Sequence, residues 1–210
     1  MNKIIKFLTT IVVFLFFFNF TSYSNDIRTL GIGINVNNID TTGYKNLSCT
    51  DDNKKLSTWN EFKKCKKNNQ NLYLVSFEYD DRYAITEEYE GTQVAGHPVL
   101  MNIGVNDNNN IEEINVITDP SAPWYFRKQS YLLWLRIYSK YGSSGWNCQE
   151  KLPKKDHLLA GNKYINKICE KTFEKKKIVL HSEFYFINNK EDKSNLISRT
   201  KMKIEKYPSS

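Results

Sequence analysis

Apolar and polar residues alternate along several segments of the chain, which is the period of a β-strand with one buried face. Short polar turns, such as the Asn-rich run 106–110, separate neighbouring segments. Short connections between period-two strands favour antiparallel pairing. The sequence therefore predicts an antiparallel β-meander. The predicted strands are 72–79, 83–90, 94–105, 111–118, 177–187 and 196–207, and a further strand is expected at 29–36.

Two segments instead have helical periodicity. In 55–66, Leu56, Trp59 and Phe62 recur on one side of a predicted helix. The longer segment, 123–141, has a wide apolar face and ends at a glycine, which is typical of a helix C-terminus. The expected fold class is therefore α+β, an antiparallel meander with two helices packed on one face. Two similar helix–meander halves are the alternative, since each helix precedes strands and each half holds a Trp near a Cys.

The N-terminus has the order of segments found in secretory signal peptides. Lys3 and Lys6 precede an apolar run, 7–18, and small residues follow at Ser22 and Ser24. The apolar run is about a dozen residues long, short of the roughly 20 that span a membrane. We therefore predict cleavage after Ser24 and one exported domain, 25–210, that is not an integral membrane protein. The segment 25–46 is expected to be a loosely packed lead-in, and a retained membrane anchor is the alternative to cleavage.

Four cysteines follow the predicted cleavage site, and an even number of cysteines in an exported chain favours disulfides. Three pairings are open to four cysteines. We favour the local pairs Cys49–Cys65 and Cys148–Cys169, each worth about 3 kcal/mol in the chain-entropy model. Metal or redox chemistry would need closely spaced C-x-x-C pairs, which the chain lacks. No metal or cofactor is predicted.

The net charge of the chain bears on whether its partner is a nucleic acid or an anionic surface. The full chain carries a formal charge of +7, of which Lys3 and Lys6 contribute two. The lysine clusters follow no nucleic-acid-binding motif, and export argues against such a partner. A weakly basic, solvated surface is expected, with attraction to anionic envelope lipids or polymers as a lesser alternative.

Three residues are the strongest candidates for a binding site. His97 lies between Gly96 and Pro98, which fix an irregular backbone around it. Trp124 and Tyr125 begin a run of three aromatics that cannot all face one core, so at least one is expected at the surface. Each candidate has a structural alternative, namely a hydrogen-bonded or surface histidine and a packed helix start.

Other polar groups fit structural roles better than catalytic ones. The carboxylates Asp80, Asp81, Glu87 and Glu88 are interpreted as a turn and a polar strand edge. The run DNNNIE at 107–112 lacks the glycine of a calcium-binding loop and is interpreted as a hairpin turn. No catalytic residue is predicted.

Several short runs of the chain are distinctive, namely GYKNLSC, W-x-E-F-x-x-C from Trp59 to Cys65, FEYDD, GTQVAGHPV, ITDP and YGSSGWNC. Together they resemble a group of small exported proteins from alphaproteobacteria, and the resemblance covers about residues 43–170. The resemblance implies a bacterial envelope location and paired cysteines, and it carries over no catalytic residues.

Together these patterns predict a periplasmic or secreted protein that binds an envelope protein or ligand without catalysis. A periplasmic hydrolase is the alternative, with a site assembled from dispersed residues such as His97 and Asp80. A secreted effector acting on another organism is the third hypothesis. A pocket that joins a histidine to a carboxylate would favour the enzyme.

Overall fold

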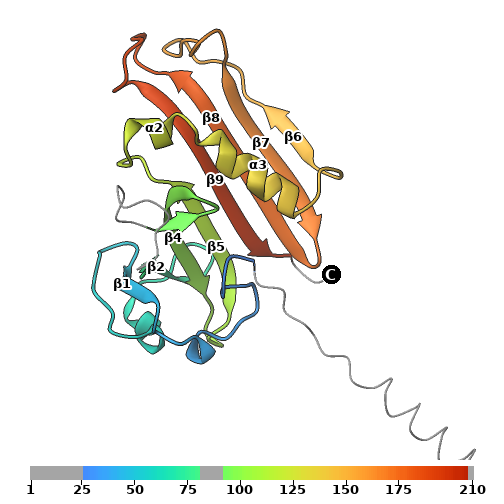
Figure 1. Cartoon of the computed structure of the whole chain (residues 1–210). Helices are drawn as coiled ribbons and strands as arrows, with labels where there is room; N and C mark the ends of the chain where they lie inside the picture. The colour runs from blue at the N-terminus through green and yellow to red at the C-terminus, as the bar shows by residue number, and fades with distance from the viewer. Residues whose placement is uncertain (1–25, 81–91, 208–210) are drawn as a thin grey trace, which may run out of the picture.

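A computed structural model describes residues 26–80 and 92–207. Within them, nine strands form one antiparallel sheet, and the helices are few and short (Figure 1). The helical segments are η1 (Val36–Asn38), η2 (Trp59–Lys64), α2 (Trp124–Arg127) and α3 (Tyr131–Lys140). The strands are β1 (Tyr44–Cys49), β2 (Tyr73–Tyr79), β3 (Gln93–Val94), β4 (His97–Val105), β5 (Ile111–Thr118), β6 (Asn147–Glu150), β7 (Ile165–Phe173), β8 (Lys176–Phe186) and β9 (Leu196–Lys206).

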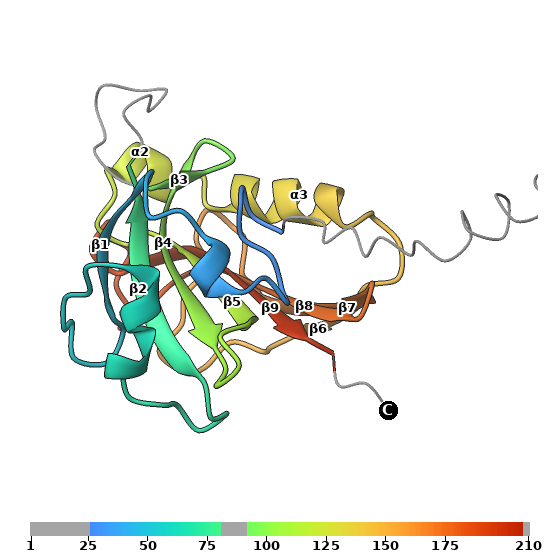
Figure 2. The ribbon, with the colours of Figure 1, turned by 90° about the horizontal axis from the view of Figure 1, so that it is seen from below.

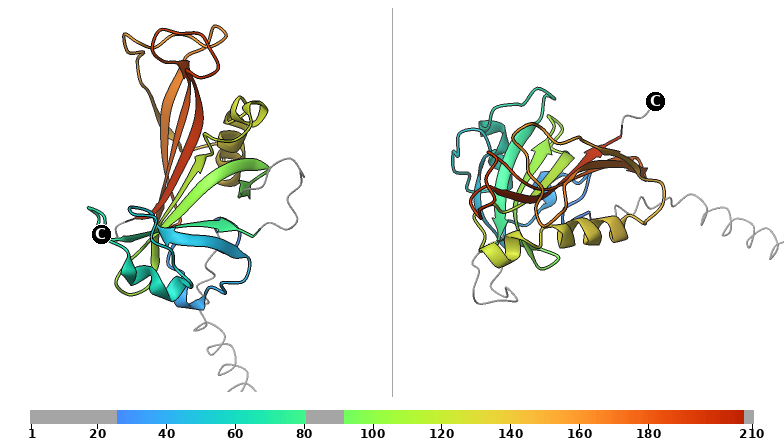
Figure 3. Two further views of the ribbon diagram at one scale, coloured as in Figure 1. Left: turned by 90° about the vertical axis from the view of Figure 1, so that its left-hand side faces the viewer. Right: turned by 90° about the horizontal axis from the view of Figure 1, so that it is seen from above.

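The sheet joins two meanders at their edges. Its order is β1-β2-β4-β5-β9-β8-β7-β6, and β3 pairs with β4 outside this path. β5 and β9 pair antiparallel and connect the two meanders. The strands fan out across the sheet, so β8 and β9 run in a different direction from β1 and β2 (Figure 3). The predicted antiparallel meander is confirmed.

The two faces of the sheet differ in chemistry because side chains alternate along each strand. One face, here called the core face, is apolar; α3 lies over its β8–β9 part (Figure 2), and η2 lies near β1 and β2. The opposite face, here called the open face, carries mostly polar side chains. Buried residues of the core face include Val75, Phe77, Met101, Ile103, Ile114, Val116, Ile178, Leu180, Met202 and Ile204.

The predicted helix 55–66 is wrong, because only the six-residue 3₁₀ helix η2 forms there. Lys55 forms a β-bridge with Ser48, and this extended backbone delays the helix start. At the other end, the Cys49–Cys65 disulfide fixes the residue that caps the helix. Trp59 and Phe62 are nevertheless buried, as their spacing predicted.

The predicted helix 123–141 is broken into α2 and α3. Tertiary hydrogen bonds hold the backbone at the break: Ser198 Oγ donates to the Arg127 carbonyl, at 2.7 Å, and Thr200 Oγ1 donates to the Ser130 carbonyl, at 2.9 Å. α3 buries Leu133 and Ile137. The fold is therefore β-rich, and an α+β fold with two helices packed on one face is not confirmed.

The segment after residue 25 packs more closely than predicted. Ile27, Leu30 and Val36 are buried in the core, and turns replace the strand expected at 29–36. The Asp26 carboxylate forms an ion pair with Lys176 Nζ at 2.8 Å, and both residues are buried. Strand β1 also begins within the expected lead-in.

Both disulfides form as predicted, Cys49–Cys65 and Cys148–Cys169. Cys148 and Cys169 lie directly opposite each other on β6 and β7. The predicted signal peptide 1–24 and strand 83–90, with Glu87 and Glu88, lie outside the described residues. Among residues 26–80 and 92–207, no helix has the length and apolar character needed to cross a membrane.

Candidate binding groove

A groove of about 1050 Å³ crosses the open face of the sheet. This volume is at the upper end of the range found for small-molecule sites, roughly 300–1,000 Å³. Strands from both meanders line the groove, so it exists only because β5 and β9 pair. The open-face residues among its lining are Ser48, Ser76, Glu78, Leu100, Asn102, Asn115, Ile117, Ile168, Val179, His181, Lys201 and Lys203.

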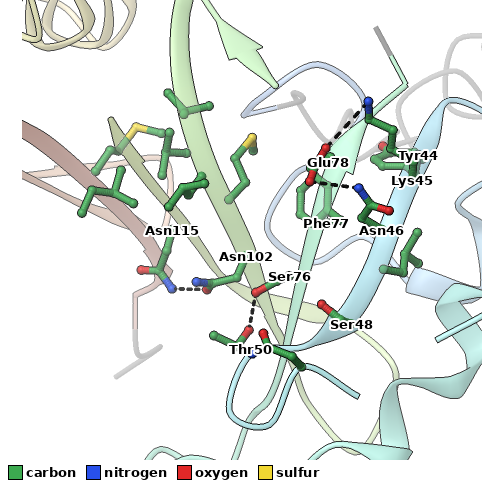
Figure 4. A pocket seen from close by; sticks show the side chains of 18 of the residues that line it. Tyr44, Lys45, Asn46, Ser48, Thr50, Ser76, Phe77, Glu78, Asn102 and Asn115 are labelled. Atoms are coloured by element: carbon green, nitrogen blue, oxygen red, sulfur yellow. Dashed lines mark hydrogen bonds and ion pairs between the residues drawn. The ribbon is translucent and has the colours of Figure 1, made fainter. Parts of the chain in front are cut away.

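Two amide side chains lie at the middle of the groove. Asn102 and Asn115 are cross-strand partners on β4 and β5, and Asn115 Nδ2 donates to Asn102 Oδ1 at 2.8 Å (Figure 4). Asn115 Nδ2 also donates to Glu113 Oε1 at 2.6 Å. These bonds fix both amides and direct the Asn102 amide nitrogen and the Asn115 carbonyl oxygen elsewhere. Among the described residues neither of these two atoms has a hydrogen-bond partner, so both can bond a ligand.

Apolar side chains flank the amides. Leu100 and Ile117 are cross-strand partners on β4 and β5, one pair along from the amides, and the Leu100 side chain remains 49% exposed. The exposed Leu100 side chain offers an apolar contact, and the fixed amides beside it on β4 and β5 offer hydrogen bonds. Such a mixture is typical of ligand pockets, where a few polar groups orient a ligand against apolar walls.

A bulged strand forms one wall of the groove. The register of β1 shifts between Lys45 and Ser48, and Asn46 has a left-handed backbone with φ of 55°. Asn46 Nδ2 consequently reaches Glu78 Oε1 at 3.0 Å, and Lys45 Nζ lies 3.7 Å from Glu78 Oε2 (Figure 4). At the same wall, the hydroxyls of Thr50 and Ser76 form a hydrogen bond of 2.8 Å. The bulge therefore turns hydrogen-bonding groups of β1 toward the sheet.

Charged side chains gather on the open face of β8 and β9. The Glu183 carboxylate is only 4% exposed, and it accepts a hydrogen bond from Arg199 Nε at 2.6 Å and one from Tyr185 Oη at 3.1 Å. Lys201 Nζ lies 3.5 Å from it. Burial raises the pKa of Glu183, but the Arg199 hydrogen bond and the surrounding positive charges outweigh burial and lower the pKa to about 2. Glu183 is therefore ionised at neutral pH.

His181 lies between this charged cluster and the groove. Its Nε2 is 2.9 Å from Asn166 Oδ1, and its Nδ1 is 3.9 Å from Glu183 Oε2. Burial lowers the pKa of His181, and the Glu183 charge opposes burial only in part. The neutral imidazole is therefore the favoured form at neutral pH.

The binding residues predicted from the sequence lie elsewhere. His97 is on the core face of β4, where it is 4% exposed, and its ring meets the edge of Phe126 with centroids 6.4 Å apart. That contact brings His97 close to α2, which carries the other two candidates. Trp124 is half-buried with Arg127 and Lys193 near its ring, and Tyr125 is 41% exposed. The three candidates are thus near neighbours, and they lie outside the groove lining.

The hairpin interpretation of 107–112 is correct, because this run joins β4 to β5. Asp107 pairs with Lys67 Nζ at 2.8 Å, so it has a structural partner. One cluster of ligand atoms, Cys49 with Asp51 and Asp52, approaches metal-binding geometry in the described residues, but the Cys49 sulfur is held in a disulfide.

Sequence reasoning missed the groove residues, although a signal was present. Polar residues occupy alternate positions of β9, at Arg199, Lys201 and Lys203, and single asparagines interrupt the apolar strands β4 and β5. Alternation was interpreted as one buried face and one solvated face. It did not reveal that six strands from distant segments would place polar residues along one groove.

No family model, curated protein or solved structure matches this chain. The function is therefore argued from the groove.

Proposed function

We propose that this protein is an exported, non-enzymatic binding protein that holds a polar ligand of the bacterial envelope in the open-face groove. The observation that supports this proposal most directly is the fixed amide pair, Asn102 and Asn115, beside the exposed Leu100. Fixed side chains lose little conformational freedom on binding, which is how preorganised sites gain affinity.

The charges of the groove favour a neutral or anionic ligand. The lining contains four lysines, Lys45, Lys55, Lys201 and Lys203, and a single carboxylate, Glu78. Several of these lysines already pair with carboxylates, which reduces the net attraction. Hydroxyl and amide groups therefore remain as the main recognition elements, and they suit a ligand rich in hydroxyl or amide groups, such as a glycan or a peptide segment.

Export is part of the proposal. Two disulfides fit an oxidising compartment, because cytosolic thiols are kept reduced. The N-terminal signature and the resemblance to exported alphaproteobacterial proteins support the same location. We place the protein in the periplasm or outside the cell.

A paired capture experiment tests the binding proposal. The purified protein and its Asn102→Leu/Asn115→Leu variant are immobilised separately and incubated with native periplasmic extract. Mass spectrometry of the bound material should find a species retained by the wild-type protein and not by the variant. That species should also raise the melting temperature of the wild-type protein. Retention of the same material by both proteins would refute the groove as the binding site.

A hydrolase remains the second candidate, because His181 and Glu183 do bring a histidine and a carboxylate together beside the groove. The arrangement lacks one requirement of nucleophilic catalysis: among the described residues, no serine, threonine or cysteine hydrogen-bonds to His181. His181→Gln separates the two functions. A hydrolase should lose hydrolysis of the captured species, whereas a binding protein should leave that species intact with either side chain.

A further inference from the structure

A second cavity lies on the core face, between α3 and the β7–β8 part of the sheet. Its volume is about 570 Å³, which is within the range of small-molecule sites. Ile165 and Phe184 are cross-strand partners in its floor, and Tyr131, Trp134 and Leu135 line it from α3. The sheet separates this cavity from the open-face groove.

The helix α3 carries more apolar surface than the core uses. Leu133 and Ile137 are buried against the sheet. A second apolar stripe, Tyr131, Trp134 and Leu135, follows the spacing i, i+3, i+4 beside the first. Tyr131 and Leu135 remain 51% and 48% exposed. Trp134 stacks on Tyr138 with ring centroids 4.6 Å apart, and all three residues of this second stripe line the cavity.

Polar groups at the same cavity indicate which ligand would fit. Lys128 and Lys163 line the cavity and have no ion pair in the part of the chain that the structure describes. An anionic head group would supply the missing counter-charge, and the apolar stripe of α3 would contact an apolar chain. A ligand with an apolar chain and an anionic head group therefore matches the lining.

We propose that this cavity binds a free long-chain fatty acid. The acyl chain lies against Tyr131, Leu135, Ile165 and Phe184, and the carboxylate lies at the side of Lys128 and Lys163. Each buried methylene adds to the affinity, so an acyl chain that fills the cavity binds without a large polar contact. This site is independent of the proposed groove function, because the two sites share no lining residue.

Bromine quenching of tryptophan fluorescence tests the proposal directly. The disulfide-bonded protein is titrated with 9,10-dibromostearate below its critical micelle concentration, and we expect saturable quenching. Trp134→Phe should lose most of the quenching amplitude while stearate binding, followed by calorimetry, persists. No saturable quenching of the wild-type protein would overturn the proposal.

Two leucine variants localise the site. Leu135→Glu places a charge in the cavity and should weaken dibromostearate binding by at least about tenfold. Leu100→Glu is the matched control, because Leu100 is 49% exposed and lies on the opposite face. Both variants alter exposed positions, and equal unfolding midpoints would confirm intact folds. If both variants lost dibromostearate binding to the same extent, or if neither variant lost it, the assignment of the site to the cavity beside α3 would be contradicted.

The head group is tested separately. Lys128→Gln/Lys163→Gln should weaken binding of stearate by about threefold to tenfold and leave stearyl alcohol unchanged, because only the acid carries a charge. Equal effects on the acid and the alcohol would refute recognition of the carboxylate. Binding to phospholipid vesicles without binding to dispersed stearate would show that the surface meets membranes, and would refute a free fatty acid as the occupant.

Discussion

Glu183 illustrates how a residue can be ionised and almost completely buried. Its carboxylate lies under three basic side chains and a tyrosine, and these partners replace water around the charge. The arrangement stabilises the folded state only while Glu183 is ionised. Its folded pKa of about 2 is below the ordinary value of 4.5, so its contribution is complete above about pH 5 and is lost as the pH falls toward 2.

Glu183→Gln should therefore lower the free energy of unfolding by about 2–3 kcal/mol at pH 7 and by roughly half as much at pH 3. Urea denaturation at the two pH values measures the difference. Glu191→Gln is the control, because Glu191 is exposed in the turn between β8 and β9. A Glu183 effect that does not change with pH would show that packing, and not charge, accounts for the loss.

Lys176 and Lys177 are neighbours with opposite surroundings, and they form a matched pair of tests. Lys176 pairs with buried Asp26, whereas Lys177 pairs with the exposed Glu170 at 3.1 Å. Lys176→Met should cost about 3 kcal/mol, because it removes the ion-pair partner of a buried carboxylate and leaves that carboxylate with the hydrogen bonds from Ile32 N and Tyr141 Oη and the charge of Lys140 nearby. Lys177→Met should cost less than about 1 kcal/mol. Equal losses in chemical denaturation would mean that the Asp26 ion pair is not the source of the stability.

At the scale of the elements, the strands could be predicted from the sequence better than the helices. Alternation along β2, β4 and β5 depends on side-chain burial within each strand, so a local pattern is sufficient. The helices depend on distant partners. The bonds from Ser198 and Thr200 that hold the break between α2 and α3 come from about 70 residues further along the chain. A local sequence pattern does not contain these distant contacts. The groove could not be predicted for the same reason, because its lining comes from both meanders.

The contribution of the Cys148–Cys169 disulfide to stability can be measured by removing it. Cys148→Ser/Cys169→Ser should lower the free energy of unfolding by about 3 kcal/mol, since the bond closes a loop of moderate length between β6 and β7. Denaturation of the wild-type protein with and without reductant gives the combined effect of both bonds. Four free thiols in unreduced protein, detected by alkylation and mass spectrometry, would contradict both pairings.

At the scale of the whole molecule, one sheet presents two different surfaces. The open face offers fixed amides and hydroxyls, and the core face offers an apolar cavity beside α3. The groove and the cavity belong to opposite faces, so ligands at the two proposed sites would not compete for the same space. Saturation of the cavity with stearate should leave capture by the groove unchanged, which the paired capture experiment measures with stearate present.

The proposed export predicts the N-terminus and the mass of the mature protein. The protein recovered from the envelope should begin at Asn25, and its intact mass should correspond to residues 25–210 with four hydrogens lost to two disulfides. Intact-mass spectrometry of protein expressed with its own N-terminus gives the answer. A mass that includes residues 1–24 would show that the N-terminal segment is retained as an anchor.

The central position of β9 has a consequence for the order of assembly. β9 is the last strand in chain order, yet it lies between β5 and β8 and connects the two meanders (Figure 1). The sheet therefore cannot be completed until Leu196–Lys206, the last strand in the sequence, has been synthesised. A chain that cannot complete its sheet until late stays unfolded for longer, and contacts between distant segments slow folding further. Such a delay would suit the export that we propose, because a chain that folds late can still pass through a membrane.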